Sequence, residues 1–389
     1  MTTTRFAPGF SDDGSKVKMP LIQDKIFPSF VESLPSLKGK CIAITGTTSG
    51  TGYWCALAAT KKEASVVLLL NRKSQRATVA DADVFDSAAN STKVVSVECD
   101  LSSFKSCRRA ATIILEQTRT FGGLDVLCCN AGIMGLPDDR TIDGFDVQMQ
   151  VNHLSHALLI DLLMPSLEEA ASLRGESRVV FHTSGARFMK SNTKGFGGKH
   201  FTKCEPLTLG GNSGQLAMAT LTSAQMKRYC HSKLANACYA MALHEHFKVK
   251  GSKVKALCAD PGAAATSLMA NGYPNVRTAD KPIYSRIVNC FKEYWQQKSM
   301  AMFKDIGQSG ADGTCPLMQA CFAPESCSGD LFTPNSFKWY MLFYGSGLPR
   351  KTIASNRATK DAYFSEASTL SREHQNAAWE ATQVVIHAA

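Results

Sequence analysis

Tyr229 and Lys233 stand four residues apart in the stretch YCHSK, at positions 229–233. On a helix, residues i and i+4 share one face, so the phenol and the ammonium would lie side by side. A free phenol has a pKa of about 10, and a fixed positive charge nearby favours the phenolate and lowers that pKa. The pair could therefore supply an acid or base that works near neutral pH. Taken alone, the stretch also fits an exposed helix whose tyrosine packs on a neighbour.

Short apolar, β-branched runs alternate with longer helical stretches from Lys38 onward. This alternation predicts repeated β-α-β units, and uniformly apolar strands are typical of a parallel sheet that helices cover on both faces. We therefore predict one Rossmann-type, doubly wound α/β domain with a mostly parallel, seven-stranded sheet. The strands that can be located are CIAIT (41–45), SVVLLLN (65–71), KVVSVEC (93–99), LDVLCC (124–129), SRVVFHT (177–183) and KVKALCA (253–259).

The first predicted strand runs into the glycine-rich stretch TGTTSGTG. Glycines permit a tight turn and a close approach of the backbone to a phosphate, and the helix that follows offers its N-terminus to the anion. The spacing is GxxxGxG instead of GxGxxG, but its place between a strand and a helix favours a dinucleotide site. The expected contacts in this turn are Gly46, Thr48, Ser49, Gly50, Thr51 and Gly52.

The second strand ends at Asn71, Arg72 and Lys73. Dinucleotide folds that prefer NAD commonly carry an acid here, which binds the ribose 2′-hydroxyl. A guanidinium suits a 2′-phosphate instead. Arg72 therefore favours NADP(H) over NAD(H). The alternative is that Arg72 and Lys73 are only solvated charges at a strand end.

Three later strands also end in polar or small residues. Asp100 and Leu101 follow the third strand, where Asp100 could bind an adenine amino group or nearby backbone, or cap the next helix, as Ser102 might. Asn130, Ala131 and Gly132 follow the fourth strand, where small residues let the chain pass close to a cofactor and Asn130 can brace neighbouring strands. Ligands of open α/β sheets bind at the carboxyl ends of strands. Ser184 after the fifth strand, Asn152 in the preceding helix, Tyr229 and Lys233 therefore form a candidate catalytic set.

The motifs TGTTSGTG, CDLSS, CNAGIM, VNHLSH, HTSGA, YCHSK and DPGAAAT occur in the order typical of short-chain dehydrogenases/reductases. The chain resembles that superfamily over about residues 38–385, and YCHSKLAN and VNHLSH are most similar to its retinol dehydrogenase branch. It also resembles light-dependent protochlorophyllide oxidoreductases, which share much of the set and carry a glycine-rich insertion like GGNSG at 210–214.

The resemblance implies a role for each matching residue. Tyr229 is expected to protonate a carbonyl oxygen or deprotonate an alcohol, and Lys233 to lower its pKa and hold the nicotinamide ribose. Ser184 would hydrogen-bond the substrate oxygen, and Asn152 would hold a helix and a water in a proton relay. Hydride would pass between the nicotinamide and the carbinol carbon. The residues expected to flank the carboxamide are Pro261, Gly262 and Thr266.

These expectations define one leading function and two rivals. The leading function is NADP(H)-dependent interconversion of a carbonyl and an alcohol on a small apolar substrate, such as a retinoid, steroid or lipid aldehyde. One rival is a light-dependent reductase like that of protochlorophyllide. The other is a non-enzymatic NADP-binding sensor or scaffold, against which the complete catalytic set argues. Forty-four residues separate Ser184 from Tyr229, more than is usual in the family, which leaves the substrate open.

Composition limits the remaining classes of function. The chain has 389 residues, 44% apolar and 20% charged, and its net charge of +10 comes from scattered Lys and Arg, so nucleic acid is not indicated. Its 14 cysteines form no CxxC pair and no apolar signal core precedes them, so we expect reduced thiols and a cytoplasmic protein. Ligand spacing predicts no metal site, and no apolar run reaches the roughly 20 residues of a membrane span.

The domain boundaries follow from changes in this pattern. Residues 1–37 are expected to be an extension that packs on the core or stays loose, and 38–389 the catalytic domain. Long insertions are often lids or binding loops. We therefore expect an insertion at 187–224, which also fits a tolerated surface loop, and an aromatic-rich, substrate-side segment at 268–308. The resemblance further implies a homodimer through helices near 142–170 and 222–249.

Overall fold

The computed structural model describes residues 22–188, 196–205, 208–211, 224–262, 264, 268, 308–337, 345–355, 357–358 and 366–389. Most of the predicted insertion at 187–224 and of the segment at 268–308 therefore lies outside the described residues, as does Thr266. Among the described residues, no helix is long and apolar enough to cross a membrane.

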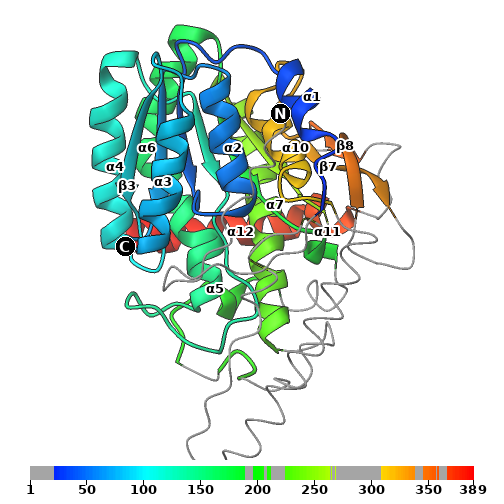
Figure 1. Ribbon diagram of the computed structural model, residues 1–389. Coiled ribbons are helices and arrows are strands. Elements are labelled where there is room, and N and C mark those ends of the chain that lie inside the picture. The colour runs from blue at the N-terminus through cyan, green and yellow to red at the C-terminus, as the bar shows by residue number, and fades with distance from the viewer. Residues whose placement is uncertain are drawn as a thin grey trace, which may run out of the picture.

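One sheet with the strand order β3-β2-β1-β4-β5-β6-β7-β8-β9 organises the fold (Figure 1). The order reverses between β1 and β4, which is the doubly wound pattern, and ligands of such sheets bind at that reversal. The strands are β1 (Cys41–Thr45), β2 (Val66–Asn71), β3 (Lys93–Glu98), β4 (Val126–Cys129), β5 (Ser177–His182), β6 (Val254–Ala259), β7 (Leu331–Phe337), β8 (Gly345–Ala354) and β9 (Arg357–Ala358).

The predicted Rossmann-type, mostly parallel sheet is confirmed. All six strands located from the sequence are present, and β7 completes seven parallel strands. The sheet then continues with two antiparallel strands, β8 and β9, so it has nine strands where seven were expected. The extra hairpin was missed because Pro334 and Pro349 interrupt a strand-like pattern.

Helices cover both faces of the sheet. The longer ones are α2 (Gly50–Lys61), α3 (Gln75–Ser87), α4 (Phe104–Thr118), α6 (Ser155–Arg174), α7 (Ala224–Lys250), α10 (Cys315–Phe322) and α12 (Arg372–Ala388). The short ones are α1 (Phe27–Ser33), α5 (Val147–Met149) and α11 (Ala367–Leu370), the π-helical turn η2 (Gln150–Leu154), and the 3-10 turns η1 (Arg119–Phe121), η3 (Gly185–Phe188), η5 (Gly198–His200) and η7 (Asp312–Thr314).

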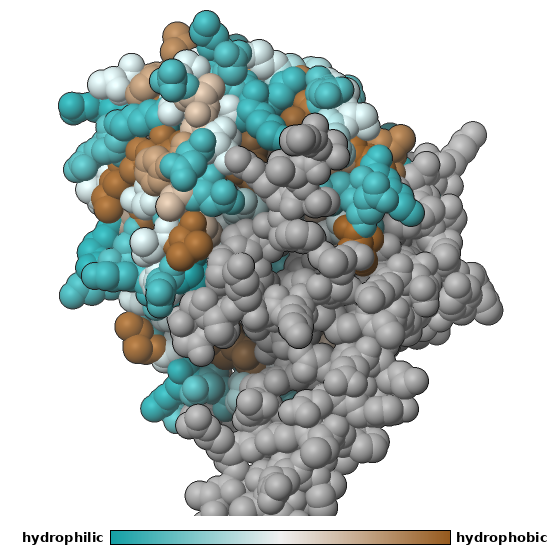
Figure 2. Space-filling model, viewed as in Figure 1, coloured by the Kyte–Doolittle hydropathy of each residue, from teal (hydrophilic) through white to brown (hydrophobic). Residues whose placement is uncertain are grey.

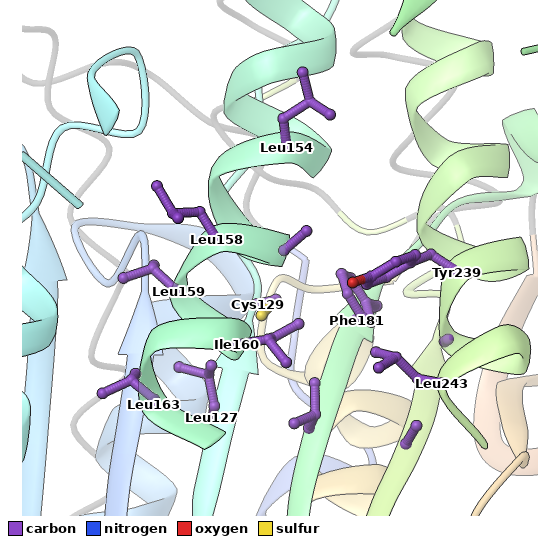
Figure 3. Close-up of a cluster of buried hydrophobic side chains, with 14 of the residues drawn as sticks. Leu127, Cys129, Leu154, Leu158, Leu159, Ile160, Leu163, Phe181, Tyr239 and Leu243 are labelled. Atoms are coloured by element: carbon purple, nitrogen blue, oxygen red, sulfur yellow. The ribbon is translucent and has the colours of Figure 1, made fainter. Parts of the chain in front are cut away.

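Two apolar layers result from alternation along the strands, because successive side chains point to opposite faces. On β4, for example, Leu127 and Cys129 pack toward α6 and α7, whereas Val126 and Cys128 pack toward α2 and α10. Figure 3 shows the first layer, where Ile160 of α6 lies toward Phe181 of β5, and Tyr239 and Leu243 of α7 lie on the other side of Phe181. Cys128 and Cys129 therefore face opposite sides of the sheet.

The described part of the N-terminal extension, residues 22–37, packs on the core. Phe27 of α1 meets the Trp54 ring of α2 edge-on, with centroids 5.1 Å apart. The Asp312 carboxylate accepts hydrogen bonds from the backbone N–H groups of Lys25, Ile26 and Phe27, at 2.9, 2.9 and 2.8 Å. Of the two alternatives left open for the extension, these residues follow the packed one.

Candidate active site

A glycine-rich turn joins β1 to α2 at the reversal of strand order. Gly46 and Gly50 have φ of +72° and +60°, which L-residues with side chains rarely adopt. A Cβ on Gly52 would lie 2.3 Å from the Asn130 Nδ2 atom, so only glycine lets the turn close against the end of β4. Ser49 precedes α2 without capping it through its side chain. The first N–H groups of α2 are therefore available to an anion, and the turn fits a dinucleotide phosphate.

The end of β2 has a buried, hydrogen-bonded asparagine and an exposed basic residue. The Asn71 side chain is buried and accepts a hydrogen bond from Thr47 N at 2.9 Å while it donates to Asp81 Oδ1 at 3.0 Å. Arg72 is exposed beside it. Arg76, the second residue of α3, donates to the Ser49 hydroxyl and adds a second guanidinium near Arg72. Arg76 was not predicted from the sequence, because it lies on the next helix and not in the residues that directly follow β2.

Asp100 and Leu101 follow β3 with different surroundings. Asp100 Oδ1 accepts hydrogen bonds from the Ser102 N–H and hydroxyl, at 2.9 and 2.7 Å. The cap considered for Asp100 or Ser102 is supplied by Ser103, whose hydroxyl accepts from Ser106 N. The Leu101 side chain is buried in the core, so its backbone is the part that a ligand could meet.

Asn130 braces the ends of β1 and β4. Its Nδ2 donates to the Thr45 carbonyl at 2.8 Å, and its Oδ1 accepts from the Thr51 hydroxyl of α2, also at 2.8 Å. The Thr45 hydroxyl in turn accepts from Ala131 N at 2.9 Å. The predicted bracing therefore exists, and it also fixes the start of α2.

The four residues of the candidate catalytic set form a connected group, of which Lys233 and Asn152 lie beside Gly132. A Cβ on Gly132 would lie 3.2 Å from Lys233 Nζ and 3.3 Å from Asn152 Oδ1. The Lys233 Nζ atom lies 5.8 Å from the Tyr229 ring centroid, and the Tyr229 hydroxyl shares a hydrogen bond with Ser184. Tyr229 and Lys233 share one face of α7, as their spacing predicts.

Burial dominates the electrostatics of this group. It raises the pKa of Tyr229 above its usual value, although the hydrogen bond with Ser184 lowers it. Burial also lowers the pKa of Lys233 to about 8, although Asp260 and Cys258 raise it. The expectation that Lys233 lowers the pKa of Tyr229 is therefore wrong for this structure: desolvation of the phenolate raises the pKa, and the group that opposes it is Ser184. At neutral pH, the Tyr229 hydroxyl therefore keeps its proton.

Asn152 joins the loop after β4 to α7. Its Oδ1 accepts from Ile133 N at 2.8 Å, and its Nδ2 lies 2.9 Å from both the Ile133 carbonyl and the Ser232 hydroxyl. It occupies the π-helical turn η2, a widened turn that is frequent at functional sites. Its backbone carbonyl lies 3.0 Å from His156 Nδ1. Through these contacts Asn152 braces the helix, which is one part of its expected role.

Arg187 is a buried arginine that was not predicted from the sequence, and it contacts the backbone of Ser184. We call Arg187, Asp260 and Glu366 the Arg187 cluster. Arg187 Nη1 lies 2.5 Å from Asp260 Oδ2 and donates to the Ser184 carbonyl at 2.9 Å, and Nη2 lies 2.9 Å from Glu366 Oε1. Asp260 Oδ1 also accepts from Gly262 N at 2.9 Å. The cluster thus connects Ser184 with the Pro261–Gly262 loop that was predicted to flank the cofactor.

A second buried arginine, Arg228, precedes Tyr229 on α7. We call Arg228, Asp138 and Asp146 the Arg228 cluster. Arg228 Nε lies 3.2 Å from Asp146 Oδ2, and Nη1 lies 3.6 Å from Asp138 Oδ2. Nη1 also donates to the Gly211 carbonyl at 3.1 Å, within the predicted insertion. Burial raises the pKa of Asp146 to about 6. No sequence pattern points to these carboxylates, because they lie far from Arg228 along the chain.

Comparison with known proteins agrees with this arrangement. The family model described as short chain dehydrogenase matches residues 40–195. Polyprenol dehydrogenase of Danio rerio is 29% identical over 69% of this chain and 75% of its own length. Retinol dehydrogenase 11 of Homo sapiens is 30% identical over 64% of this chain and 69% of its own length.

Solved structures show the same fold. A protein of Mycobacterium paratuberculosis described as uncharacterized aligns over 92% of this chain and 97% of its own, with a TM-score of 0.57 and 23% identity. The 3-ketoacyl-(acyl-carrier-protein) reductase of Brucella melitensis, complexed with NADH, aligns over 77% of this chain and 97% of its own, with a TM-score of 0.50 and 18% identity. Because both are less than 25% identical to this chain, these structures show only that the fold is shared.

Proposed function

Because the chain belongs to the short-chain dehydrogenase/reductase family, in its retinol dehydrogenase-like branch, we propose that it is an NADP(H)-dependent oxidoreductase that interconverts a carbonyl and an alcohol on an apolar substrate. The observation that carries the proposal is that Lys233 lies beside Gly132 and near the Tyr229 ring, while Tyr229 is hydrogen-bonded to Ser184. The bound nicotinamide would supply the hydride.

Each residue of the set has a task in carbonyl reduction. Tyr229 would donate its proton to the carbonyl oxygen, and the raised pKa keeps that proton in place at neutral pH. Ser184, already hydrogen-bonded to Tyr229, would hold the same oxygen. Lys233, mostly protonated below pH 8, would donate to a ribose hydroxyl from its position beside Gly132. Oxidation of an alcohol would instead need Tyr229 as the phenolate, to accept the proton of the hydroxyl.

NADP(H) is preferred over NAD(H) in this proposal because the end of β2 carries no free acid. Arg72 is exposed there, and Arg76 adds a second guanidinium beside Ser49. Asp81, the carboxylate that Asn71 contacts, is buried and also accepts from the Ser96 hydroxyl at 2.6 Å. A 2′-phosphate would meet positive charge at this edge of the site.

An apolar substrate is supported by the side chains around the phenol. Tyr229, Cys230, Met134 and Ala186 form one buried apolar cluster, and Leu268 packs against it. The described residues therefore give the proposed reaction site an apolar wall, which suits a hydrocarbon chain or ring.

Pairing into a homodimer is part of the proposal. Leu173 at the end of α6 and Val249 at the end of α7 are 66% and 87% exposed, on the two helices expected to pair. Where Figure 2 colours the surface by hydropathy, apolar residues are scattered among hydrophilic ones. Sedimentation equilibrium would find a dimer if the proposal holds and a monomer if it does not.

A turnover assay tests the reaction. Purified protein should oxidise NADPH in the dark with at least one carbonyl from a panel of retinal, steroid ketones and medium-chain aldehydes, and NADH should serve less well. Absence of turnover on the whole panel despite tight NADPH binding would favour the sensor. Turnover of protochlorophyllide only under illumination would favour the light-dependent enzyme instead.

Arg72→Glu tests the cofactor preference. Loss of a charge-assisted phosphate contact of about 1.5–3 kcal/mol should weaken NADPH binding by about ten- to a hundred-fold and leave NADH binding nearly unchanged. The control is Arg109→Glu, the same charge change on an arginine that is 63% exposed on α4. Equal weakening of NADPH and NADH binding in Arg72→Glu would contradict the role of this residue.

A further inference from the structure

Three buried cysteines from distant parts of the chain meet in the core layer between the sheet, α2 and α10. They are Cys55 on α2, Cys128 on β4 and Cys321 on α10, and their Sγ atoms all lie within 4.8 Å of one another. Their exposed fractions are 0, 0 and 2%. We call them the cysteine triad. The residues are 73 and 193 positions apart along the chain, from 55 to 128 and from 128 to 321, so motif spacing could not reveal the group.

The donor set selects the class of ion. Among the described residues, the triad brings together three sulfur atoms and no oxygen or nitrogen ligand. Hard cations such as Mg²⁺ and Ca²⁺ require oxygen ligands, and structural Zn²⁺ sites almost always have four ligands. Thiolates prefer soft ions, among them copper(I). Three sulfurs around one ion, at metal–sulfur bonds of about 2.3 Å, would lie about 4 Å apart, which the observed spacing allows.

The surroundings suit a soft monovalent ion. The triad belongs to an apolar cluster with residues such as Ile44, Val180 and Leu257, which exclude water. Positive charge lies near the end of α10, where Arg178 Nη1 donates to the carbonyls of Ala320 and Ala323 at 3.1 and 2.8 Å. That guanidinium, itself paired with Glu176, would offset part of the negative charge of the thiolates.

We propose that Cys55, Cys128 and Cys321 bind one copper(I) ion through their three sulfur atoms. Each thiol that becomes a ligand releases its proton to solvent, and the oxidation state of copper does not change. The bound ion would join α2, which presents its N-terminus to the cofactor, to the sheet and to α10. It would thereby stabilise the folded chain without touching the proposed catalytic set.

The test uses the full-length, reduced protein and copper(I) under anaerobic conditions, with a copper(I) chelator as competitor. The variants are Cys128→Ala and Cys321→Ala. Each has a matched control: Cys129→Ala, the buried neighbour on β4 that faces the opposite layer, and Cys315→Ala, buried on the same helix α10. The readouts are copper retained per chain, the melting temperature, and X-ray absorption of the loaded parent protein.

The proposal predicts one ion per chain in the parent and in both controls, with a raised melting temperature and a first shell of three sulfurs. The triad variants should bind copper(I) at least tenfold more weakly. Equal retention by Cys128→Ala and Cys129→Ala would overturn the site. Loss of all copper to the chelator, or a disulfide between triad cysteines in place of bound ion, would also overturn it. If the triad variants do not fold, the sulfur count in the parent still decides.

Discussion

The Arg187 cluster lies next to Ser184 and the Arg228 cluster next to Tyr229 along the chain, and each buries one guanidinium with two carboxylates. The Arg187 cluster has short, multiple contacts, with Asp260 at 2.5 Å and Glu366 at 2.9 Å. The Arg228 cluster is looser, with Asp146 at 3.2 Å and Asp138 at 3.6 Å, and the arginine relies more on backbone carbonyls. Both arginine side chains are at most 1% exposed.

The difference follows from what each cluster joins. The Arg187 cluster connects the ends of β5 and β6 with Glu366, just before α11, so it holds Ser184 and the Pro261–Gly262 loop in one fixed frame. The Arg228 cluster connects the first turns of α7 with two loops, around residues 136–146 and 209–211. We infer that the cofactor side of Tyr229 is built for rigidity and the insertion side for adjustment. The predictions that follow test that contrast.

The largest effect is expected for Arg187→Met. Methionine keeps most of the volume but leaves Asp260 and Glu366 buried without a counter-charge, which should lower the free energy of unfolding by about 3–5 kcal/mol. Chemical denaturation measures this change. Arg109→Met is the control, because its ion pair with Glu98 is 3.8 Å long and exposed, and it should change stability by less than about 0.5 kcal/mol. Similar losses in both variants would refute the rigid frame.

A smaller loss, about 2–3 kcal/mol, is expected for Arg228→Met. Its carboxylates are less tightly paired, and Asp146 can take up a proton at little cost because its pKa is already about 6. Turnover should fall more than in a stability-matched core variant, because Tyr229 is the next residue. A loss of stability as large as that of Arg187→Met would remove the distinction between the two clusters.

The smallest of the three effects is a change in pH dependence, expected for Asp146→Asn. Asparagine keeps an oxygen that can accept from Met149 N, as Asp146 Oδ1 does at 2.8 Å. The folded-state pKa of about 6 exceeds the ordinary aspartate pKa of 3.8, so ionisation of Asp146 costs stability as pH rises between these values. The parent should therefore lose about 2 kcal/mol relative to the variant between about pH 4.5 and 7. A difference that is constant with pH would contradict the raised pKa.

Much of the cofactor side could be predicted from the sequence because its signals are local. Strands such as CIAIT are continuous apolar runs, and Gly46 and Gly52 are required by turn geometry at fixed places between a strand and a helix. The four-residue spacing of Tyr229 and Lys233 is likewise a local property of α7.

The rest depends on contacts that the order of residues does not display. Arg187 and Glu366 are 179 positions apart, and Cys55 and Cys321 of the cysteine triad are farther apart still. The four-residue spacing also could not predict that the pKa of Tyr229 is raised, because the shift depends on how much water the folded chain removes from the phenol. Burial and long-range pairing are products of the whole fold.

The most direct test of the central claim compares Tyr229→Phe with Tyr239→Phe. Both tyrosines are buried on α7, and Tyr239 lies outside the proposed catalytic set, where its hydroxyl accepts from Gln383 at 3.0 Å. NADPH affinity and carbonyl reduction would be measured for each. The account predicts that Tyr229→Phe keeps its NADPH affinity and loses turnover by at least a hundred-fold, while Tyr239→Phe keeps both. Undiminished turnover in Tyr229→Phe would contradict the assignment of this residue as the proton donor.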